Sequence, residues 1–413
     1  MNKVPLNKLV FRAFCIFSLT LFCIWFILLM RDPKQFQIFF ASGQNLFADF
    51  TNVMIYGAER NPYGPMTPGG GAEHAYLPLS YLITWMFAKP FPREALTGFD
   101  MWMNPQILIL ISLFFTAVAA MFSIQIYSAI EGKTVDKFLG FAAVMSSGLL
   151  ISAFERGNLI ILATVLTMFF IMNYRHENKI IRELSFIALA AAAALKMTPA
   201  IFGLLLVFNG KFKDAVRLVI YGVIMAVGPL VFIQGGFSNI PTLIDNIGLN
   251  VEAYRRVIGC GMRSVPLLLC PESETMGKLA LYAVLGLAVI IVLSMPVMKK
   301  QWQVVLAIAL LSIMLPGHSE TYNALFLLPA LIMMFNDKEL KLYEALLLLP
   351  FLGMFCSIKF IEKAPRDYVC VLTSVLMIML AFITSLPLII KALKQKSYFS
   401  SCKSLIVNFF KRG

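Results

Sequence analysis

Long apolar runs follow one another along almost the whole chain, and they constrain the fold more than any other feature. Several approach the roughly 20 consecutive apolar residues that a helix needs to cross a bilayer. The composition agrees, because 59% of the 413 residues are hydrophobic and 14% are charged, whereas about a quarter of a soluble domain is charged. The mean hydropathy is +0.80. The sequence therefore predicts a polytopic membrane protein.

The runs predict an all-α fold, a polytopic transmembrane helix bundle of about 12 spans, with interfacial helices in the first external loop. We expect a single integral membrane domain over residues 1–413, because no internal repeat and no second domain is visible. The first run follows Lys3, Lys8 and Arg12 and precedes no small-residue cleavage site, which predicts a retained anchor with its N-terminus inside. The runs cover residues 13–30, 77–91, 105–127, 138–174 (interrupted at 155–158), 184–208, 218–233, 279–298, 304–315, 322–335, 343–358 and 369–390.

The net charge of +13 is spread over short loops and the C-terminal tail. This distribution favours retention of Lys and Arg on the cytoplasmic side and argues against nucleic-acid binding. Counting spans from an inside N-terminus places a first loop (31–77) and a second long loop (235–277) outside, and a basic tail (391–413) inside. The same count places residues 155–158 inside, away from the first loop. If one of the short runs re-enters instead of crossing, residues 155–158 move outside.

The first loop contains apolar residues at helical spacing from Phe36 to Met54. This spacing predicts an amphipathic helix in the membrane interface, with Asp49 on its polar face. Turn signals at 61–64 and 68–71 end that helix. A carboxylate on such a face is ordinary, so two interpretations stand: Asp49 solvates its helix, or it acts as a base at the bilayer boundary.

Several short motifs occur in a fixed order along the chain. They are Asp49-Phe50, Asn61-Pro62-Tyr63, Tyr76-Leu77-Pro78-Leu79, Glu155-Arg156-Gly157-Asn158 and Leu195-Lys196-Met197-Thr198-Pro199. Their order resembles the GT-C superfamily of membrane glycosyltransferases, and glycosyltransferase family 87 in particular, over residues 1–235. In that family an acidic residue of the first external loop is the catalytic base, and Asp49 matches its place. The sequence departs from the family pattern at Leu77-Pro78 and Asn158, which leaves the sugar open.

The resemblance implies a hexosyltransferase that takes one sugar, mannose in the first instance, from a polyprenyl-phosphate donor. Its partners would be membrane lipids, that donor, and a glycan or glycolipid acceptor at the outer face, with no nucleic acid and no cofactor. Its location would be a bacterial inner membrane. Two alternatives stay open: a flippase or transporter of lipid-linked sugars, which also uses broken helices, and a polysaccharide polymerase.

Basic residues are candidates for binding the donor phosphate. Lys196 lies inside an apolar run, where a lysine costs about 2.5–3.5 kcal/mol on insertion scales. It therefore faces a cavity or a partner, or it extends its ammonium toward an interface. Arg255 and Arg256 lie in the second long loop, and guanidinium groups suit bidentate phosphate recognition. Paired arginines are also common as solvated charge, so both interpretations stand.

Further candidates for substrate binding come from the motifs and the loops. Glu155, Arg156 and Asn158 form either a self-neutralising loop or a re-entrant tip that frames the sugar site. His318 follows an apolar run, and it either contacts the substrate or caps the end of a helix. Tyr63, in its motif, and His74, in the polar part of the first loop, complete the substrate-binding set. His74 is either an acceptor contact or a solvated histidine.

The sequence shows no metal-ligand constellation, and its seven cysteines have no metal spacing. The carboxylates of Asp49 and Glu59 or Glu73 would be the ligands of a divalent ion, but we expect a site without metal. Cys260 and Cys270 share the second long loop, and two interpretations stand: free thiols, or a disulfide if that loop faces an oxidising compartment.

Overall fold

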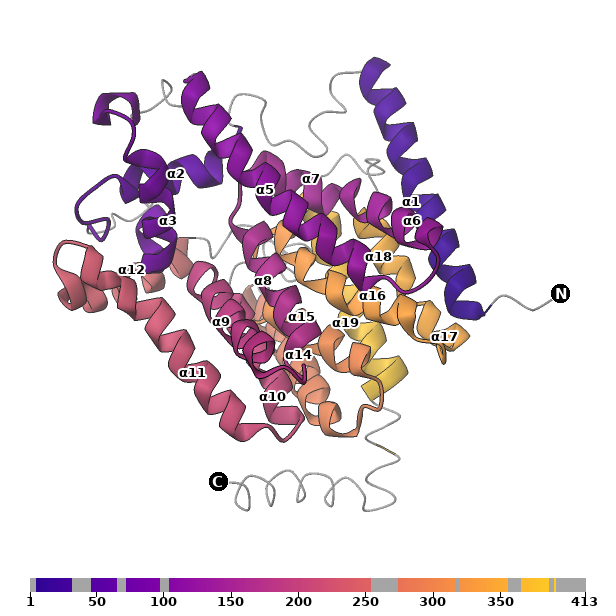
Figure 1. Ribbon diagram of the computed structural model, residues 1–413. Coiled ribbons are helices and arrows are strands. Elements are labelled where there is room, and N and C mark those ends of the chain that lie inside the picture. Colours follow the sequence, from indigo (N-terminus) through magenta and orange to yellow (C-terminus); the bar gives the residue numbers. More distant parts are fainter. Residues whose placement is uncertain are drawn as a thin grey trace.

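The structure is a computed structural model of the chain. It describes residues 5–31, 46–64, 72–96, 104–253, 274–316, 319–355, 365–385 and 390. Every regular element within these ranges is a helix (Figure 1), so the all-α prediction is confirmed for the described part of the chain.

Three helices of the described residues are long and apolar enough to cross a membrane. They are α1 (Leu6–Arg31), α5 (Pro105–Ala129), and α11 (Phe212–Val227) with its continuation η5 (Gly228–Phe232). A fourth candidate is bent by 51° where α6 (Thr134–Met145) meets α7 (Gly148–Glu155). The membrane character predicted from composition is therefore matched by long apolar helices.

Among the described residues, none of the remaining helices is both long and apolar enough to be a candidate span by itself. They are α2 (Ala48–Gly57), η2 (Ala72–Ala75), α3 (Pro78–Ala88), η3 (Arg93–Leu96), α8 (Ile160–Asn173), α9 (Lys179–Leu195), η4 (Thr198–Gly203), α10 (Leu204–Phe208), η6 (Gly236–Asn239), α12 (Ile240–Ala253), α14 (Glu274–Ser294), η7 (Met295–Val297), α15 (Gln301–Met314), η8 (Thr321–Leu327), α16 (Leu328–Asn336), α17 (Leu342–Ala345), α18 (Leu348–Phe355), α19 (Pro365–Leu380) and the π-helical η9 (Ala381–Ser385).

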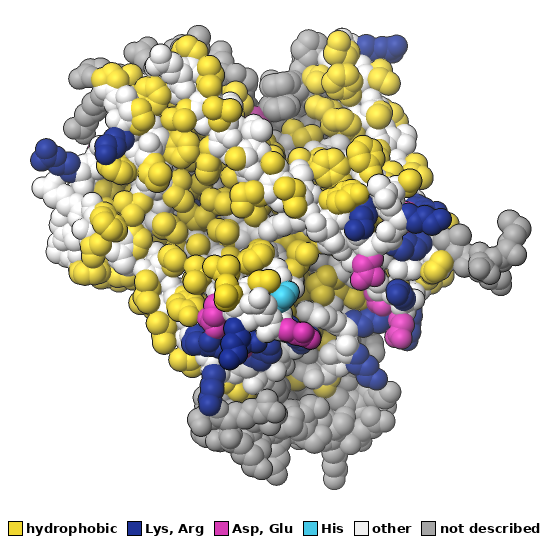
Figure 2. Space-filling view, in the orientation of Figure 1, with side chains coloured by type: hydrophobic (Ala, Val, Ile, Leu, Met, Phe, Trp, Pro, Cys, Tyr) yellow, Lys and Arg dark blue, Asp and Glu magenta, His cyan; other side chains and the backbone are white. Residues whose placement is uncertain are grey.

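The core of the bundle is formed by α8, α15 and α16, which lie in its middle in Figure 1. Helix α15 is apolar all round and buries nearly every side chain, as expected for a central helix. In contrast, α1, α5 and α11 lie outside, and α11 buries only Leu218. The space-filling view shows a broad apolar surface over these outer helices (Figure 2). Such a surface suits contact with lipid.

Hydrogen bonds define two ends of the bundle. At one end, Asn7 Nδ2 donates to the Phe335 carbonyl at 3.0 Å, and Asn336 Nδ2 donates to the Ala129 carbonyl at 2.7 Å. The Gln301 amide donates to the Tyr174 hydroxyl at 3.1 Å. We call this end, with turns 130–133, 174–178, 209–211, 298–300 and 337–341, the basic end, because it carries many lysines and arginines. The opposite end, with residues 47–49, 76–77, 155–158, 196 and 320–322, is the motif end.

Helix α3 differs from the predicted span at 77–91. It has 11 residues and so spans about 16 Å, roughly half of a bilayer's apolar thickness. It packs along α2 at the motif end. The predicted span at 184–208 also differs, because α9 ends at Leu195 and the chain turns back through η4 and α10. Asn209, after α10, consequently bonds to Tyr174, just before α9.

Helix α2 is not a surface helix. It begins at Ala48, and Phe50, Val53 and Met54 are at most 2% exposed. Phe50 packs against aromatic rings of α3 and α5, while residues 36–45 of the predicted amphipathic segment lie outside the described residues. The apolar residues of α2 are thus spaced for burial on several sides. The spacing within one helix does not distinguish such burial from contact with a membrane surface.

Candidate functional site

The first loop is joined by its backbone to the turn between α7 and α8. The Phe47 N–H donates to the Glu155 carbonyl at 2.8 Å, and the Asp49 N–H donates to the Arg156 carbonyl at 2.9 Å. Gly157, with φ +61°, lies against Phe47, and a Cβ on this glycine would be 2.9 Å from the Phe47 Cα. Only glycine fits both the conformation and the space. This contact fixes the position of Asp49.

The Asp49 carboxylate is bound by two side chains of the same turn. Oδ1 accepts hydrogen bonds from Arg156 Nε at 3.0 Å and from Arg156 Nη2. Oδ2 accepts from Asn158 Nδ2 at 2.6 Å. The Asp49 side chain is 15% exposed. A carboxylate offers about four acceptor positions, so these three donors leave room on Oδ2 for one further proton.

Two local features stabilise this arrangement. Asp49 lies in the first turn of α2, where the helix dipole favours a negative charge. Asn158 is 1% exposed, and its Oδ1 accepts from the Ile160 N–H at 2.9 Å, at the start of α8. The amide of Asn158 is therefore held in one orientation, with its NH₂ group toward Asp49.

Lys196 lies at the same end, at the break between α9 and η4. It ends α9 in an extended conformation, and Pro199 follows in the next turn. Its Nζ is 3.5 Å from the Tyr76 hydroxyl and 4.8 Å from the centroid of the Tyr76 ring. The charges of Asp49 and Glu320 both act on Lys196. The predicted membrane-depth lysine is thus at a helix end, beside the motif residues.

Two residues of this region were missed by sequence reasoning. Glu320 and Tyr322 lie at the start of η8. The charge of Glu320 acts on Lys196, and the charge of Asp49 acts on the Tyr322 hydroxyl. Their signal was present: they follow the apolar run 304–315, whose end falls on the side of Asp49. Among the residues that follow this run, only His318 was predicted as a site residue.

Tyr63 and His74 lie in a neighbouring contact between the first loop and α12. The Tyr63 hydroxyl donates to the Tyr76 carbonyl at 3.2 Å, its ring packs on Tyr81, and burial raises its pKa. The His74 ring packs on Tyr56, 4.2 Å between centroids. Tyr63 therefore supports the backbone of Tyr76, and the hydrogen bonds to the Asp49 carboxylate come from Arg156 and Asn158 instead.

The structure brings together Asp49, Arg156, Asn158 and Lys196 among the predicted site residues. Glu155 is adjacent, 4% exposed, and its charge acts on Arg156. Arg255, Arg256 and His318 lie outside the described residues, as do Cys260 and Cys270. In the described part of the chain, no group of three His, Cys, Asp or Glu residues is placed to hold a metal ion.

The contact between Asp49 and Arg156 overturns the span count that put residues 155–158 on the opposite side. That count treated 77–91 as a crossing, but α3 is too short to cross and stays with α2. The alternative, in which one short run does not cross, agrees with the contact. Residues 155–158 therefore belong to the same end of the bundle as the first loop.

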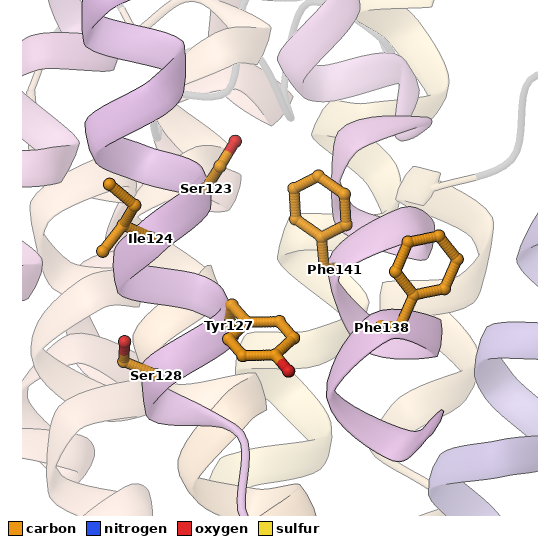
Figure 3. A pocket seen from close by; sticks show the side chains of 6 residues that line it. All are labelled: Ser123, Ile124, Tyr127, Ser128, Phe138 and Phe141. Atoms are coloured by element: carbon orange, nitrogen blue, oxygen red, sulfur yellow. The ribbon is translucent and has the colours of Figure 1, made fainter. Parts of the chain in front are cut away.

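A separate groove lies between α5 and α6 (Figure 3). It has a volume of about 290 Å³ and is lined by Ser123, Ile124, Tyr127, Ser128, Phe138 and Phe141. Its lining contains none of the candidate site residues, and Tyr127 lies close to the basic end. The groove is therefore distinct from the cluster around Asp49.

Fold and site together define an all-helical protein with candidate membrane spans and a carboxylate–guanidinium–amide cluster at one end. No protein-family model matches this sequence, and no curated protein sequence gives a significant match.

Proposed function

We propose that the protein is a polyprenyl-phosphate-sugar-dependent glycosyltransferase, with mannose as the first sugar to test. One observation carries the proposal: Arg156 and Asn158 hold the Asp49 carboxylate while leaving an acceptor position on Oδ2, beside Lys196 at one end of an apolar bundle. A base next to a cation, both at the boundary of an apolar body, suits transfer from a lipid-borne donor.

In the proposed reaction, Asp49 Oδ2 accepts the proton of the acceptor hydroxyl as its oxygen attacks the anomeric carbon. The new bond joins that oxygen to the anomeric carbon, and the bond from this carbon to the phosphate oxygen breaks with inversion. The electron pair leaves with the polyprenyl phosphate. Because negative charge grows on the phosphate, a cation at that point lowers the barrier.

Lys196 is our candidate for that cation. The charge of Asp49 acts on Lys196, and the ammonium of Lys196 lies over the Tyr76 ring. Arg156 is a positioning residue, because both its hydrogen bonds go to the oxygen that would not take the proton. Asp49 would thus take the proton of the acceptor, and Lys196 would stabilise the leaving phosphate.

The charge distribution supports an orientation for this chemistry. Lysines and arginines favour the cytoplasmic side of membrane proteins, so the basic end would lie in the cytoplasm. The motif end would then face outward, where the acceptor would be a cell-envelope glycan or a glycolipid. We propose a multi-pass protein of a bacterial inner membrane.

The test is sugar transfer by purified protein in proteoliposomes that contain labelled polyprenyl-phosphate sugars and a panel of lipid-linked acceptors. We expect Asp49→Asn to reduce transfer by about 10²–10⁴-fold while the protein stays inserted and folded. Asp245→Asn, on the exposed face of α12, is the matched control and should keep full activity. Full activity of Asp49→Asn would reject the role of base. Donor movement across the bilayer without transfer would favour a flippase, and joining of preassembled units a polymerase.

A further inference from the structure

Two basic side chains contact Tyr174, the buried residue that follows α8 at the basic end, and a third acts on one of them. The Arg175 guanidinium lies 5.2 Å and the Lys211 ammonium 5.7 Å from the centroid of its ring. Lys211 Nζ also donates to the Tyr174 carbonyl at 3.4 Å. Arg182 of α9 completes the group, because its charge acts on Lys211. The α8–α9 turn and the α10–α11 turn thus bring three cations to one place.

Three other cations of the basic end are neutralised by carboxylates. These pairs are Arg12 with Asp136, Arg217 with Glu183 and Asp214, and Lys300 with Asp337 and Glu344. Within the described ranges, by contrast, Arg175, Arg182 and Lys211 form no ion pair. The cluster therefore differs from these three paired cations, whose charge is compensated inside the protein.

The charges of this cluster repel one another. Burial lowers the pKa of Lys211; Asp214 opposes this change, and Arg175 and Arg182 add to it. Asp214 cannot compensate the group, because it is also bonded to Arg217. A bound anion would remove the repulsion and satisfy the unused N–H groups of the guanidinium and ammonium groups.

The start of α11 adds a second feature that suits an anion. Lys211 precedes α11, and no side chain caps the helix there. The N-terminus of a helix attracts phosphate groups through its backbone N–H groups and the helix dipole. There is also space, since a Cβ on Gly210 would meet no atom within 4 Å.

The outer face of α11 indicates where such an anion would come from. Val216, Val219, Val223 and Ile224 are all more than half exposed, so an apolar face runs from the cluster along the helix. In Figure 2, Lys and Arg side chains gather at the lower margin of the apolar surface. A phosphate next to an apolar face is the arrangement of a lipid, and basic pockets at helix ends bind anionic headgroups.

We propose that Arg175, Arg182, Lys211 and the first turn of α11 form a binding site for the phosphate group of an anionic phospholipid, in the leaflet at the basic end. The hydrocarbon chains lie along the outer face of α11. This site is independent of the glycosyltransferase proposal, because it uses none of the residues around Asp49.

Native mass spectrometry of the purified full chain tests the proposal with phosphatidylglycerol and with zwitterionic phosphatidylcholine. We expect the double variant Arg175→Gln/Lys211→Gln to bind phosphatidylglycerol about 25-fold more weakly, about fivefold for each cation. Lys338→Gln, an exposed lysine at the same end, removes one charge elsewhere and should change binding less than twofold. Thermal unfolding confirms that the variants are folded.

Adding inorganic phosphate distinguishes the two sources of the anion. Displacement of phosphatidylglycerol only by phosphate far above cellular concentrations supports the lipid, whereas binding of free phosphate alone, with the same loss in the double variant, assigns the site to a soluble phosphate and overturns the lipid assignment. Equal binding by wild type and double variant, or an equal loss in Lys338→Gln, overturns the site itself.

Discussion

Gly157 carries two constraints at one residue. Its φ of +61° lies in the left-handed region, and its α-carbon faces Phe47 across the contact that fixes Asp49. We expect Gly157→Ala to destabilise the protein by about 1–3 kcal/mol, because the methyl group would lie 2.9 Å from the Phe47 backbone. Thermal unfolding in detergent measures the effect.

A glycine without these constraints provides the control. Gly222 lies within α11, and a Cβ there would meet no atom within 4 Å. Gly222→Ala should be neutral or stabilise the helix by about 0.5–1 kcal/mol. If both substitutions changed stability equally, the contact between Gly157 and Phe47 would not be what holds the first loop in place.

Arg156 tests whether the orientation of the carboxylate matters for the proposed reaction. Arg156→Lys keeps the positive charge but loses the planar fork that reaches Oδ1 with two nitrogens. We expect kcat to fall about 10–100-fold, with KM for the donor changed less than about twofold, since the donor phosphate contacts Lys196 in this proposal. A rise in KM at constant kcat would instead make Arg156 a donor-binding residue.

The residues around Asp49 show what the sequence could predict. The motif order, through its resemblance to a known family, pointed to Asp49, Arg156 and Lys196, although each residue also had an ordinary explanation. The pairing of Asp49 with Arg156 could not be predicted, since it depends on which short runs cross. Glu320 was overlooked because, unlike Lys196, it lies outside an apolar run, and His318 in the same segment was the candidate there.

At the scale of elements, α2 and α3 form a tight pair that supports the site. A Cβ on Gly57 would be 2.6 Å from the Thr84 Oγ1 and 3.1 Å from the Tyr81 carbonyl. The Ser80 hydroxyl of α3 donates to the Leu195 carbonyl at 3.2 Å, next to Lys196. Close approach of the two helices therefore helps to place the lysine.

We expect Gly57→Ala to force α2 and α3 apart and to cost about 1–3 kcal/mol. The same substitution at Gly248 in α12, where a Cβ would meet nothing within 4 Å, is the control. Thr84→Ala combined with Gly57→Ala should recover part of the lost stability, because it removes the closest clashing atom. If the double variant is no more stable than Gly57→Ala in chemical or thermal unfolding, the clash is with the Tyr81 backbone.

Hydropathy predicted where helices occur better than how far they reach. The run at 77–91 and the run at 184–208 are both apolar, yet α3 stops after 11 residues and the second run turns back at Lys196. The apolar content of a run indicates that its residues are excluded from water. This content is the same for a helix that crosses the membrane and for a short helix buried by its neighbours. Lys196 and Pro199 were the local signals of the break.

At the scale of the molecule, the two ends differ in charge. Turns of the basic end carry lysines and arginines that the bundle compensates only in part, whereas the motif end concentrates the Asp49 cluster. This asymmetry was predictable from the sequence as a bias of the loops. Its assignment to particular ends required the packing, because the bias says nothing about which turns lie together.

The orientation of these ends can be measured by cysteine labelling in intact spheroplasts. In a chain whose seven native cysteines are replaced by serine or alanine, we expect Asp245→Cys and Arg60→Cys, both exposed at or near the motif end, to react with a membrane-impermeant maleimide. Lys338→Cys, exposed at the basic end, should react only after lysis. The cysteine-free chain is the control for background.

Each other labelling pattern has a distinct physical meaning. Reaction of Lys338→Cys alone in intact cells would place Asp49 in the cytoplasm, where the donor sugar would have to be reached from the inner leaflet. Reaction of all three positions before lysis would mean that the two ends do not lie on opposite sides of a membrane. That result would contradict the claim that the bundle crosses the membrane. Because the labelling does not depend on activity, it tests the orientation even if sugar transfer is never detected.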